Sequence, residues 1–427
     1  MIGTLDTSRK EATIVGAGIA GMLAAYSLDK RGYRVTLIEE SERAGGLIKT
    51  STTEYGIAES AAHSLIATKA VRELCQELGV GLIEPRKESK AKFIVRNGKL
   101  RRFPLGIGEA ARTISRAAFV RSENDENQDL DSWARRHLGK AALDYLMTPF
   151  VRGIYGVQPA ELGVAAAYPG LSIPPGKTLL GKVFARKQNA SSKREPKKRM
   201  APQFGMGDLV SKLEQHLEQT LGSRFRKNHK IISVPDAANV IIATPAYAAA
   251  AMLNEIAPNL GTRLRSVNYT PIVSVTVFVA QEALHHPLHG TGVLMPACEN
   301  RKSLGILFNS SSFAYRVADN SHFASFTVMM GGTSQQHWLT VSDDEIRQAL
   351  KLELAEVLGI REPLAVKIHR WPAALPQYST DLPGVWQTAQ STWCARPGRI
   401  LFGNYTGQIS LRGMIESAAE LGREAFA

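Results

Sequence analysis

Residues 12–40 read ATIVGAGIAGMLAAYSLDKRGYRVTLIEE, and this stretch decides the fold. An apolar run of strand length leads into three glycines spaced G-x-G-x-x-G from Gly16, and a helical stretch then continues to Gly32. Arg34–Glu39 has the pattern of a second strand. Together these features predict one strand–helix–strand unit of a Rossmann-like α/β sheet.

The spacing of the glycines has a physical reason at each position. Gly16 allows a tight turn, Gly18 lets the backbone approach a pyrophosphate, and Gly21 lets the helix pack closely on the strand. The phosphates would then lie at the helix N-terminus, which favours anions. Glu39 follows Gly21 by 18 residues, where a carboxylate at a strand end can accept both hydroxyls of an adenosine ribose. Nicotinamide and flavin dinucleotides both fit this pattern.

A second glycine loop narrows the choice between nicotinamide and flavin dinucleotides. Residues 43–47 read RAGGL, so two adjacent glycines follow the acidic strand end and let the backbone close over a diphosphate. A glycine-rich turn alone is weak evidence, but here strands, helix and acidic residue agree. The combination resembles the flavin-dependent amine oxidase superfamily, and this resemblance implies FAD as the cofactor.

The composition is that of a soluble protein with more than one domain. A chain of 427 residues exceeds what one core usually serves, and 44% hydrophobic residues is ordinary for a globular protein. Cys75, Cys298 and Cys394 are far apart and show no metal-binding or redox spacing, so we expect packed free thiols in a reducing cytoplasm. Residues 1–10 lack the apolar core of an export signal.

The positive charge is concentrated in one segment of the chain. The formal net charge is +13, and residues 182–200 contain eight basic side chains against Glu195 alone. The basic residues are Lys182, Arg186, Lys187, Lys193, Arg194, Lys197, Lys198 and Arg199. Clustered Lys and Arg each add about 1 kcal/mol of attraction to an anionic membrane, whereas the alternative is a solvated loop. Nucleic acid is not expected, because no recognition motif accompanies the charge.

Membrane contact would have to be peripheral. The longest apolar runs, near residues 240–253 and 272–280, are too short or interrupted by proline to span a bilayer. We therefore expect a cytoplasmic protein and leave open a peripheral position on the inner face of the cell membrane.

The rest of the chain alternates between helical and strand patterns. Residues 91–103 predict a hairpin with Asn97-Gly98 at its turn. A leucine at every fourth position predicts a helix that Asp208 caps and Gly222 ends. Beyond Pro271 the pattern is mainly β, with predicted strands at 272–279, 304–309, 323–330 and 366–370 and one helix at 343–358. A final strand, turn and helix at 399–423 could return the chain to the cofactor.

Five further stretches resemble the protoporphyrinogen oxidase family, in order along nearly the whole chain. They are LMTPFVRGIYGVQPAELGVAAAYPG (146–170), TGVLMPACENRKSLGILFNS (291–310), VMMGGT (328–333), RWPAALPQY (370–378) and GNYTGQISLRGMIESA (403–418). The combination is far more specific than any one motif.

The resemblance implies an α/β and α+β multidomain fold with three parts. These are a Rossmann-like FAD-binding domain (1–86, 201–266 and 386–427), a β-rich substrate-binding domain (87–104, 191–200 and 267–385) and a helical, membrane-associating domain (105–190).

The resemblance also implies the site residues. The flavin contacts carried over are Gly16, Gly18, Ile19, Gly21, Glu39, Gly46, Leu47, Ser60, Ala61, Ala62, His63, Val234, Asn404, Ile409, Ser410 and Leu411. The substrate contacts are Lys92, Arg152, Gly153, Leu294, Leu307 and Met329, although the apolar ones are also typical of ordinary core. The chain departs from the family at Ser60, where glycine is usual, at Lys92, where arginine commonly meets a propionate, and in a short segment at 225–239.

The activity implied is oxidation of protoporphyrinogen IX to protoporphyrin IX in haem biosynthesis, with hydride transfer from a meso carbon to the flavin N5 and oxygen as electron acceptor. No Ser-His-Asp order, nucleophilic cysteine or metal cluster is recognisable, and the histidines at 285–289 predict a surface loop rather than a metal site. No catalytic side chain is assigned.

Other functions and partners stay open. Coproporphyrinogen III is the alternative substrate, and an amine or carotenoid oxidase or a non-catalytic tetrapyrrole-binding protein are alternative functions. Another electron acceptor and a homodimer are also left open.

Overall fold

A five-stranded parallel sheet forms the first part of the fold. The computed structural model describes residues 1–123, 127–188, 198–284 and 288–423. The strand order is β10 (Phe225–Arg226), β2 (Arg34–Ile38), β1 (Glu11–Val15), β11 (Asn239–Ile242) and β17 (Arg399–Leu401). All neighbouring strands are parallel, so the sheet gathers three segments that lie far apart in the sequence.

Helices cover both faces of this sheet, which is why its strands are apolar on both sides. Side chains such as Ile14 and Ile241 pack in one core with α1 (Ile19–Asp29), α9 (Met206–Leu221) and α15 (Leu411–Glu420). The alternate side chains Val15 and Ile242 pack in a second core. The helices of that second core include α10 (Ala246–Leu253), α11 (Pro258–Arg265) and α14 (Leu382–Ser391). The leucine repeat of α9 is buried as expected, but Gly205 rather than Asp208 precedes the helix.

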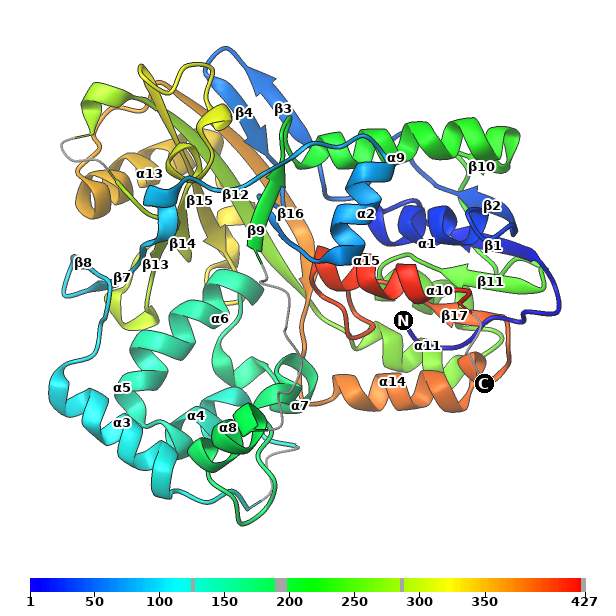
Figure 1. Cartoon of the computed structure of the whole chain (residues 1–427), viewed down its shortest axis with the longest axis horizontal. Helices are drawn as coiled ribbons and strands as arrows, with labels where there is room; N and C mark the ends of the chain where they lie inside the picture. The colour runs from blue at the N-terminus through cyan, green and yellow to red at the C-terminus, as the bar shows by residue number, and fades with distance from the viewer. Residues whose placement is uncertain (124–126, 189–197, 285–287, 424–427) are drawn as a thin grey trace.

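A seven-stranded sheet forms the second part (Figure 1). Its order is β16 (Ala365–Pro376), β12 (Tyr269–Ala280), β15 (Phe323–Gly331), β14 (Gly305–Phe308), β13 (Gly292–Leu294), β7 (Lys92–Arg96) and β8 (Lys99–Arg101). Only the β7–β13 pair is parallel. The predicted hairpin turn is confirmed, because Asn97 and Gly98 both have positive φ, at 53° and 69°.

Helix α13 (Asp343–Leu358) covers one face of the seven-stranded sheet. Ser342 and Glu345 form a capping box at its start, and its buried side chains share a core with Val273 and Val328. The alternate residues of the same strands are therefore directed to the opposite face, which lies toward the rest of the molecule.

Helices at residues 107–188 form the third part, at the lower left of Figure 1. They are α3 (Ile107–Phe119), α4 (Leu130–His137), α5 (Lys140–Ala142), a π-helical turn (Leu143–Met147), α6 (Thr148–Tyr155), α7 (Val164–Ala167) and α8 (Leu179–Gln188). In the described part of the chain, no helix is both long and apolar enough to cross a bilayer.

Small sheets connect these parts, and one of them changes an expected boundary. Strand β9 (Lys198–Pro202) begins in residues that we expected with the β-rich domain, yet it pairs with β5 (Leu65–Ala67) and β6 (Leu82–Ile83). A hairpin of β3 (Thr50–Thr53) and β4 (Gly56–Glu59) reaches the segment before β15, where Gly56 bridges to Val317. The last residues of β9 are Met200, Ala201 and Pro202, all buried.

Candidate functional site

The glycine loop after β1 has the geometry of a phosphate-binding turn. Gly16 has a φ of +97°, and a Cβ on Gly21 would lie 1.8 Å from the Gly16 carbonyl oxygen, so both positions require glycine. A Cβ on Gly18 would meet no heavy atom within 4 Å. Gly18 caps α1 without a side-chain hydrogen bond, and no acidic residue occupies the first turn. The helix N-terminus is thus open to an anion and fits a pyrophosphate.

The second glycine loop lies against the first. Gly45 N donates to the Ala17 carbonyl at 2.8 Å, and a Cβ on Gly46 would lie 3.4 Å from the Gly18 Cα. The Arg43 guanidinium donates to the carbonyls of Ala44 and Ile48, at 2.9 and 3.0 Å, and so fixes the loop. Two backbone segments without side chains therefore form one cradle, as a diphosphate requires.

Glu39 lies at the end of β2, beside this cradle. Its Oε2 accepts a hydrogen bond from Ala17 N at 2.7 Å, and its Oε1 accepts bonds from Ser41 N and Oγ at 3.0 and 2.5 Å. A carboxylate offers about four acceptor positions, so capacity for a ribose hydroxyl remains on Oε2. The residue orders the glycine loop as well as fitting its predicted contact.

Residues 60–63 form a loop between the cradle and the seven-stranded sheet. Ser60 is fully buried, and its Oγ donates to the Leu47 carbonyl at 2.7 Å and accepts from Lys49 N at 2.9 Å. The Ser60 carbonyl accepts the Trp371 indole N–H at 2.7 Å. The serine that departs from the family pattern therefore ties this loop to the second glycine loop, while Ala62 packs against the first core.

The C-terminal predicted contacts lie at the start of α15, which packs on α1. Ser410 Oγ accepts the Gly413 N–H at 3.1 Å and caps this helix. The Asn404 carbonyl accepts the Tyr378 hydroxyl at 2.6 Å. Ile409 and Val234 pack against the second core, whereas Ile19 and Leu411 pack against the first. These residues remain predicted flavin contacts.

His63 is a neutral imidazole in this environment. Burial, followed by the charges of Arg316 and His369, lowers its pKa from 6.5 to about 3. Burial also lowers the pKa of His369 on β16. Within the described chain, the buried His63 Nε2 and His369 Nδ1 have no hydrogen-bond partner. A polar ligand or water would satisfy these atoms.

Four predicted substrate residues share one face of the seven-stranded sheet. Lys92 aligns with Gly292, which aligns with Leu307. In the next row Leu294 aligns with Gly305, which aligns with Met329. Because directly paired residues project to the same side of a sheet, the four side chains of Lys92, Leu294, Leu307 and Met329 lie on one face.

Helix α6 lies over this face and brings the other two predicted substrate residues. A Cβ on Gly153 would lie 2.5 Å from the Leu294 Cδ2, so the helix closely approaches Leu294, which would have to move for a larger residue. Arg152 is buried, and its Nη1 donates to the Met295 carbonyl at 3.1 Å. Its Nε has no partner in the described residues. Arg152 thus contacts the backbone beside Leu294, whereas Lys92 is exposed.

The same face carries a row of buried polar side chains that was not predicted from the sequence. Ser274 and Thr276 on β12 and Ser325 on β15 are buried hydroxyls without a partner among the residues that the structure describes. Ser274 pairs across the sheet with both Met329 and His369. The alternation SVTV at 274–277 was a readable signal of one polar and one apolar face.

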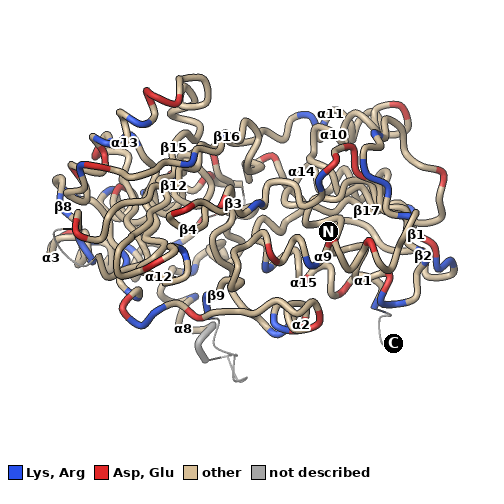
Figure 2. The backbone as a smooth tube through the Cα atoms, turned by 90° about the horizontal axis from the view of Figure 1, so that it is seen from above, with Lys and Arg blue, Asp and Glu red and all other residues tan. Residues whose placement is uncertain are grey.

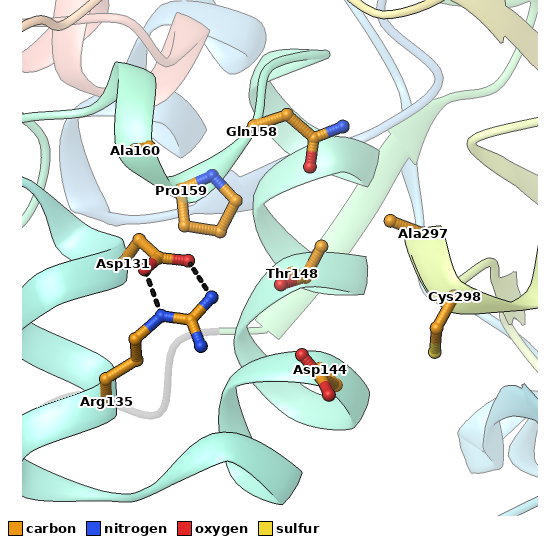
Figure 3. A pocket seen from close by; sticks show the side chains of 9 residues that line it. All are labelled: Asp131, Arg135, Asp144, Thr148, Gln158, Pro159, Ala160, Ala297 and Cys298. Carbon is orange, nitrogen blue, oxygen red and sulfur yellow. Dashed lines mark hydrogen bonds and ion pairs between the residues drawn. The ribbon is translucent and has the colours of Figure 1, made fainter.

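Two surface hollows lie elsewhere, in the helical part. A pocket of about 200 Å³ is lined by residues of α4, α6 and the 295–298 loop, including Asp131, Thr148 and Cys298 (Figure 3). A groove of about 740 Å³ lies beside α3 and α5. None of the predicted site residues lines either one. In the described ranges no cluster of three metal-ligating side chains occurs, and residues 285–287 of the histidine-rich run lie outside them.

The chain is similar to flavoproteins over nearly its whole length. A family model described as flavin containing amine oxidoreductase matches residues 19–425. Protoporphyrinogen oxidase 2 of Arabidopsis thaliana is 26% identical, with 97% of this chain and 93% of the relative covered. Coproporphyrinogen III oxidase of Bacillus subtilis is 22% identical, with 88% of each covered.

A solved structure shows the same fold. Cyclohexylamine oxidase from Brevibacterium oxydans superposes with a TM-score of 0.69 at 14% identity, over 96% of this chain and 97% of that one. The match to the flavin containing amine oxidoreductase model confirms the family expected from the glycine loops, and with it FAD as the cofactor.

Gly18→Val tests the phosphate-binding turn. The added side chain meets no protein atom nearby, so the chain should fold, but it would occupy the space of the pyrophosphate. We expect FAD occupancy after purification to fall below about a tenth of the wild-type value. The absorbance ratio at 450 and 280 nm measures it. Gly108→Val in α3, where a Cβ also meets nothing, is the matched control. A folded, fully yellow Gly18→Val protein would refute this cofactor position.

His63 should make stability depend on pH. Unfolded His63 binds a proton below its ordinary pKa of 6.5, whereas folded His63 does so only near 3. The contribution to unfolding free energy is therefore complete above pH 6.5 and decreases as pH falls, by about 2 kcal/mol at pH 5. Urea denaturation at pH 7 and 5 should show a smaller decrease for His63→Gln than for wild type. Exposed His289→Gln should match wild type, and equal decreases in all three would contradict a low pKa.

Proposed function

Because the chain belongs to the flavin containing amine oxidoreductase family, we propose that this FAD-dependent oxidoreductase oxidises a porphyrinogen to the porphyrin, with protoporphyrinogen IX as substrate. The observation that supports this most is the sheet face described above. It combines Leu294, Leu307 and Met329 with the cation Lys92, under a helix that approaches closely at Gly153. A large apolar macrocycle with carboxylate side chains matches that combination.

The chemistry requires little from the protein's side chains. FAD, when bound, would supply the hydride acceptor, and the substrate's pyrroles would stabilise the positive charge that hydride loss leaves at the meso carbon. The chain has to hold the ring against the cofactor and exclude water. Apolar contacts at Leu307 and Met329 would hold the ring, and Lys92 would orient a propionate as a point charge.

Three two-electron oxidations convert a porphyrinogen to a porphyrin. We propose oxygen as the electron acceptor, with hydrogen peroxide as its product. Coproporphyrinogen III is the second candidate substrate, because a coproporphyrinogen III oxidase is among the relatives over most of the chain. It carries more carboxylates than protoporphyrinogen, so the number of cations near the ring should separate the two.

Anaerobic mixing tests the reaction directly. The purified FAD-containing protein is mixed with each porphyrinogen without oxygen, and the absorbance at 450 nm is followed. We expect rapid bleaching by protoporphyrinogen IX. Bleaching by coproporphyrinogen III alone would select the second candidate. Bleaching by an amine or a carotenoid but by neither porphyrinogen would reject the proposal, and porphyrin binding without bleaching would indicate a non-catalytic binding protein.

Lys92 and Met329 should affect different parts of the substrate. Lys92→Ala removes a cation, so it should raise KM for the porphyrinogen acid by about tenfold and change KM for its methyl ester little. Met329→Ala loosens ring packing and should weaken acid and ester alike. Steady-state fluorescence of the porphyrin product measures both. Arg152→Ala should also impair the acid, but it disturbs the buried contact with Met295 as well. Equal losses on acid and ester in Lys92→Ala would contradict the propionate contact.

We also propose that the protein contacts an anionic membrane surface, from the cytoplasmic side, through α3. Ile107, Ile114 and Phe119 are 93, 62 and 79% exposed, and Arg112 and Arg116 lie exposed on the same helix. An exposed apolar and basic helix favours the interface of an anionic bilayer. Elsewhere in Figure 2 basic and acidic residues alternate over most of the chain.

Buried Cys75 and Cys394 and exposed Cys298 are all free thiols, which supports a reducing cytoplasm.

Some basic residues of the 182–200 segment make contacts within the protein. Lys198 pairs with Glu84 at 2.7 Å, and Arg199 donates to Ser312 Oγ at 3.0 Å and stacks on Phe313. Both residues belong to β9, and the lipid contact that we expected of this segment stays a prediction. Lys193, Arg194 and Lys197 lie outside the described residues, as do the side chains of Arg186 and Lys187. Lys182 donates to the Ser172 carbonyl.

Substitution on α3 tests the membrane surface. Ile114→Ser combined with Phe119→Ser removes exposed apolar area, so sedimentation with vesicles of phosphatidylglycerol and phosphatidylcholine should fall about tenfold or more. Exposed Leu352→Ser on α13 is the control. Binding by wild type should weaken as salt is raised, since the Arg112 and Arg116 contribution is screened. Equal vesicle binding by the α3 variant and the control would contradict the proposed surface.

A further inference from the structure

A buried ion pair joins the β3–β4 hairpin to the segment before β15, beside the loop of residues 60–63. Glu59 ends β4, and Arg316 ends the short 3-10 helix Ala314–Arg316 that precedes β15. The Arg316 Nη1 and the Glu59 Oε1 form the pair, and each side chain is only 2% exposed. Breaking such a pair leaves an uncompensated buried charge, so its position in the chain is strongly constrained.

The Glu59 carboxylate is satisfied from the cofactor-binding part. Met206 N, at the start of α9, donates to Oε1 at 2.8 Å. Thr50 Oγ1, on the neighbouring strand β3, donates to Oε2 at 2.6 Å. These two donors and Arg316 together fix the carboxylate, and hence the end of β4.

Arg316 also binds the main chain of the same loop. Its Nη2 donates to the His63 carbonyl at 2.7 Å. One planar guanidinium therefore contacts both ends of the segment, at the Glu59 side chain and at the His63 backbone. Phe313 and Tyr315 lie under the guanidinium, with ring centres 5.8 and 5.2 Å away, and restrict its rotation.

The loop has a second connection to the seven-stranded sheet. Trp371 on β16 donates its indole N–H to the Ser60 carbonyl at 2.7 Å. Trp371 is two residues from His369, so both project to the face that carries Met329. The backbone of residues 59–63 is thus held by Arg316 and Trp371, which belong to the part of the molecule with the predicted substrate face.

We propose that Arg316 is a positioning residue for the flavin, and that it does so by fixing the backbone of residues 59–63 through Glu59 and the His63 carbonyl. This rests on the assignment of residues 60–63 to the FAD site, and it does not depend on which substrate is oxidised. Residues of the part that carries the predicted substrate face would thereby set the position of a cofactor loop that follows β4 along the chain.

The Arg316→Lys variant distinguishes a positioning role of Arg316 from a purely structural one. Arg316→Lys keeps one positive charge for Glu59, but an ammonium lacks the rigid fork that reaches the His63 carbonyl at the same time. The variant should therefore retain the buried pair, and with it most of the thermal stability, while the loop loses one of its supports. A residue with only a structural role would be rescued by lysine in both respects.

The experiment measures FAD release from the holoprotein. Wild type, Arg316→Lys and Arg316→Met are diluted, and the fluorescence of released FAD is followed with time. We expect release about tenfold faster or more in both Arg316 variants, because a charge-assisted contact to the loop is lost. The matched control is Arg301→Met, which removes another arginine–glutamate pair, between Arg301 in the segment before β14 and Glu356 on α13. It should release FAD at the wild-type rate.

Two outcomes would overturn the proposal. One is wild-type FAD release by Arg316→Lys, and the other is release by Arg301→Met as fast as by Arg316→Met at equal loss of melting temperature. If Arg316→Met does not fold, Arg316→Lys alone decides. The experiment uses no porphyrinogen. Failure of the proposed reaction in separate assays would therefore leave the FAD-release result unchanged, and the two failures can be told apart.

Discussion

The close approach of α1 to β1 is the constraint on which the rest of the site depends. Helix and strand meet with no side chain between them, because a Cβ on Gly21 would be 1.8 Å from the Gly16 carbonyl. This contact places the uncapped N-terminus of α1 at the carboxyl edge of the parallel sheet, where ligands of open α/β sheets bind. Gly45 and Gly46 complete the cradle only because the first loop is already flat.

Polar groups are buried beside the 60–63 loop, where the β3–β4 hairpin meets the segment before β15. Removing one partner of a buried ion pair such as Glu59–Arg316 typically costs about 3–5 kcal/mol of stability. Apolar packing could hold two domains together without a buried charge that depends on its partner. The same seam contains Ser274, His63 and His369, with polar atoms that lack protein partners in the described structure. Such groups are tolerated where ligands or ordered water satisfy them.

Much of the fold could be predicted from the sequence because it depends on local signals. The spacing from Gly16 to Gly21, the Asn97-Gly98 turn and the capping box at Ser342 each act over a few residues. The Glu59–Arg316 pair could not be predicted, since the partners are 257 residues apart and nothing near either one indicates the other. The position of Lys198 and Arg199 in a strand could not be predicted for the same reason. Their partners Glu84 and Ser312 come from distant segments, so a strand looked like part of a charged loop.

The order in which the chain contributes strands to the parallel sheet determines when this sheet can be completed during synthesis. Strand β17 pairs with β11, and Leu401 bridges back to Ile2, so the earliest and latest parts of the chain close one sheet. At about 5–20 residues per second, a ribosome completes such a chain on the order of a minute after starting it. During that interval the sheet lacks its edge strand β17, and α1 lacks α15, which packs on it. FAD capture should therefore be a post-translational event, and the nascent chain should depend on chaperones until the last strand emerges.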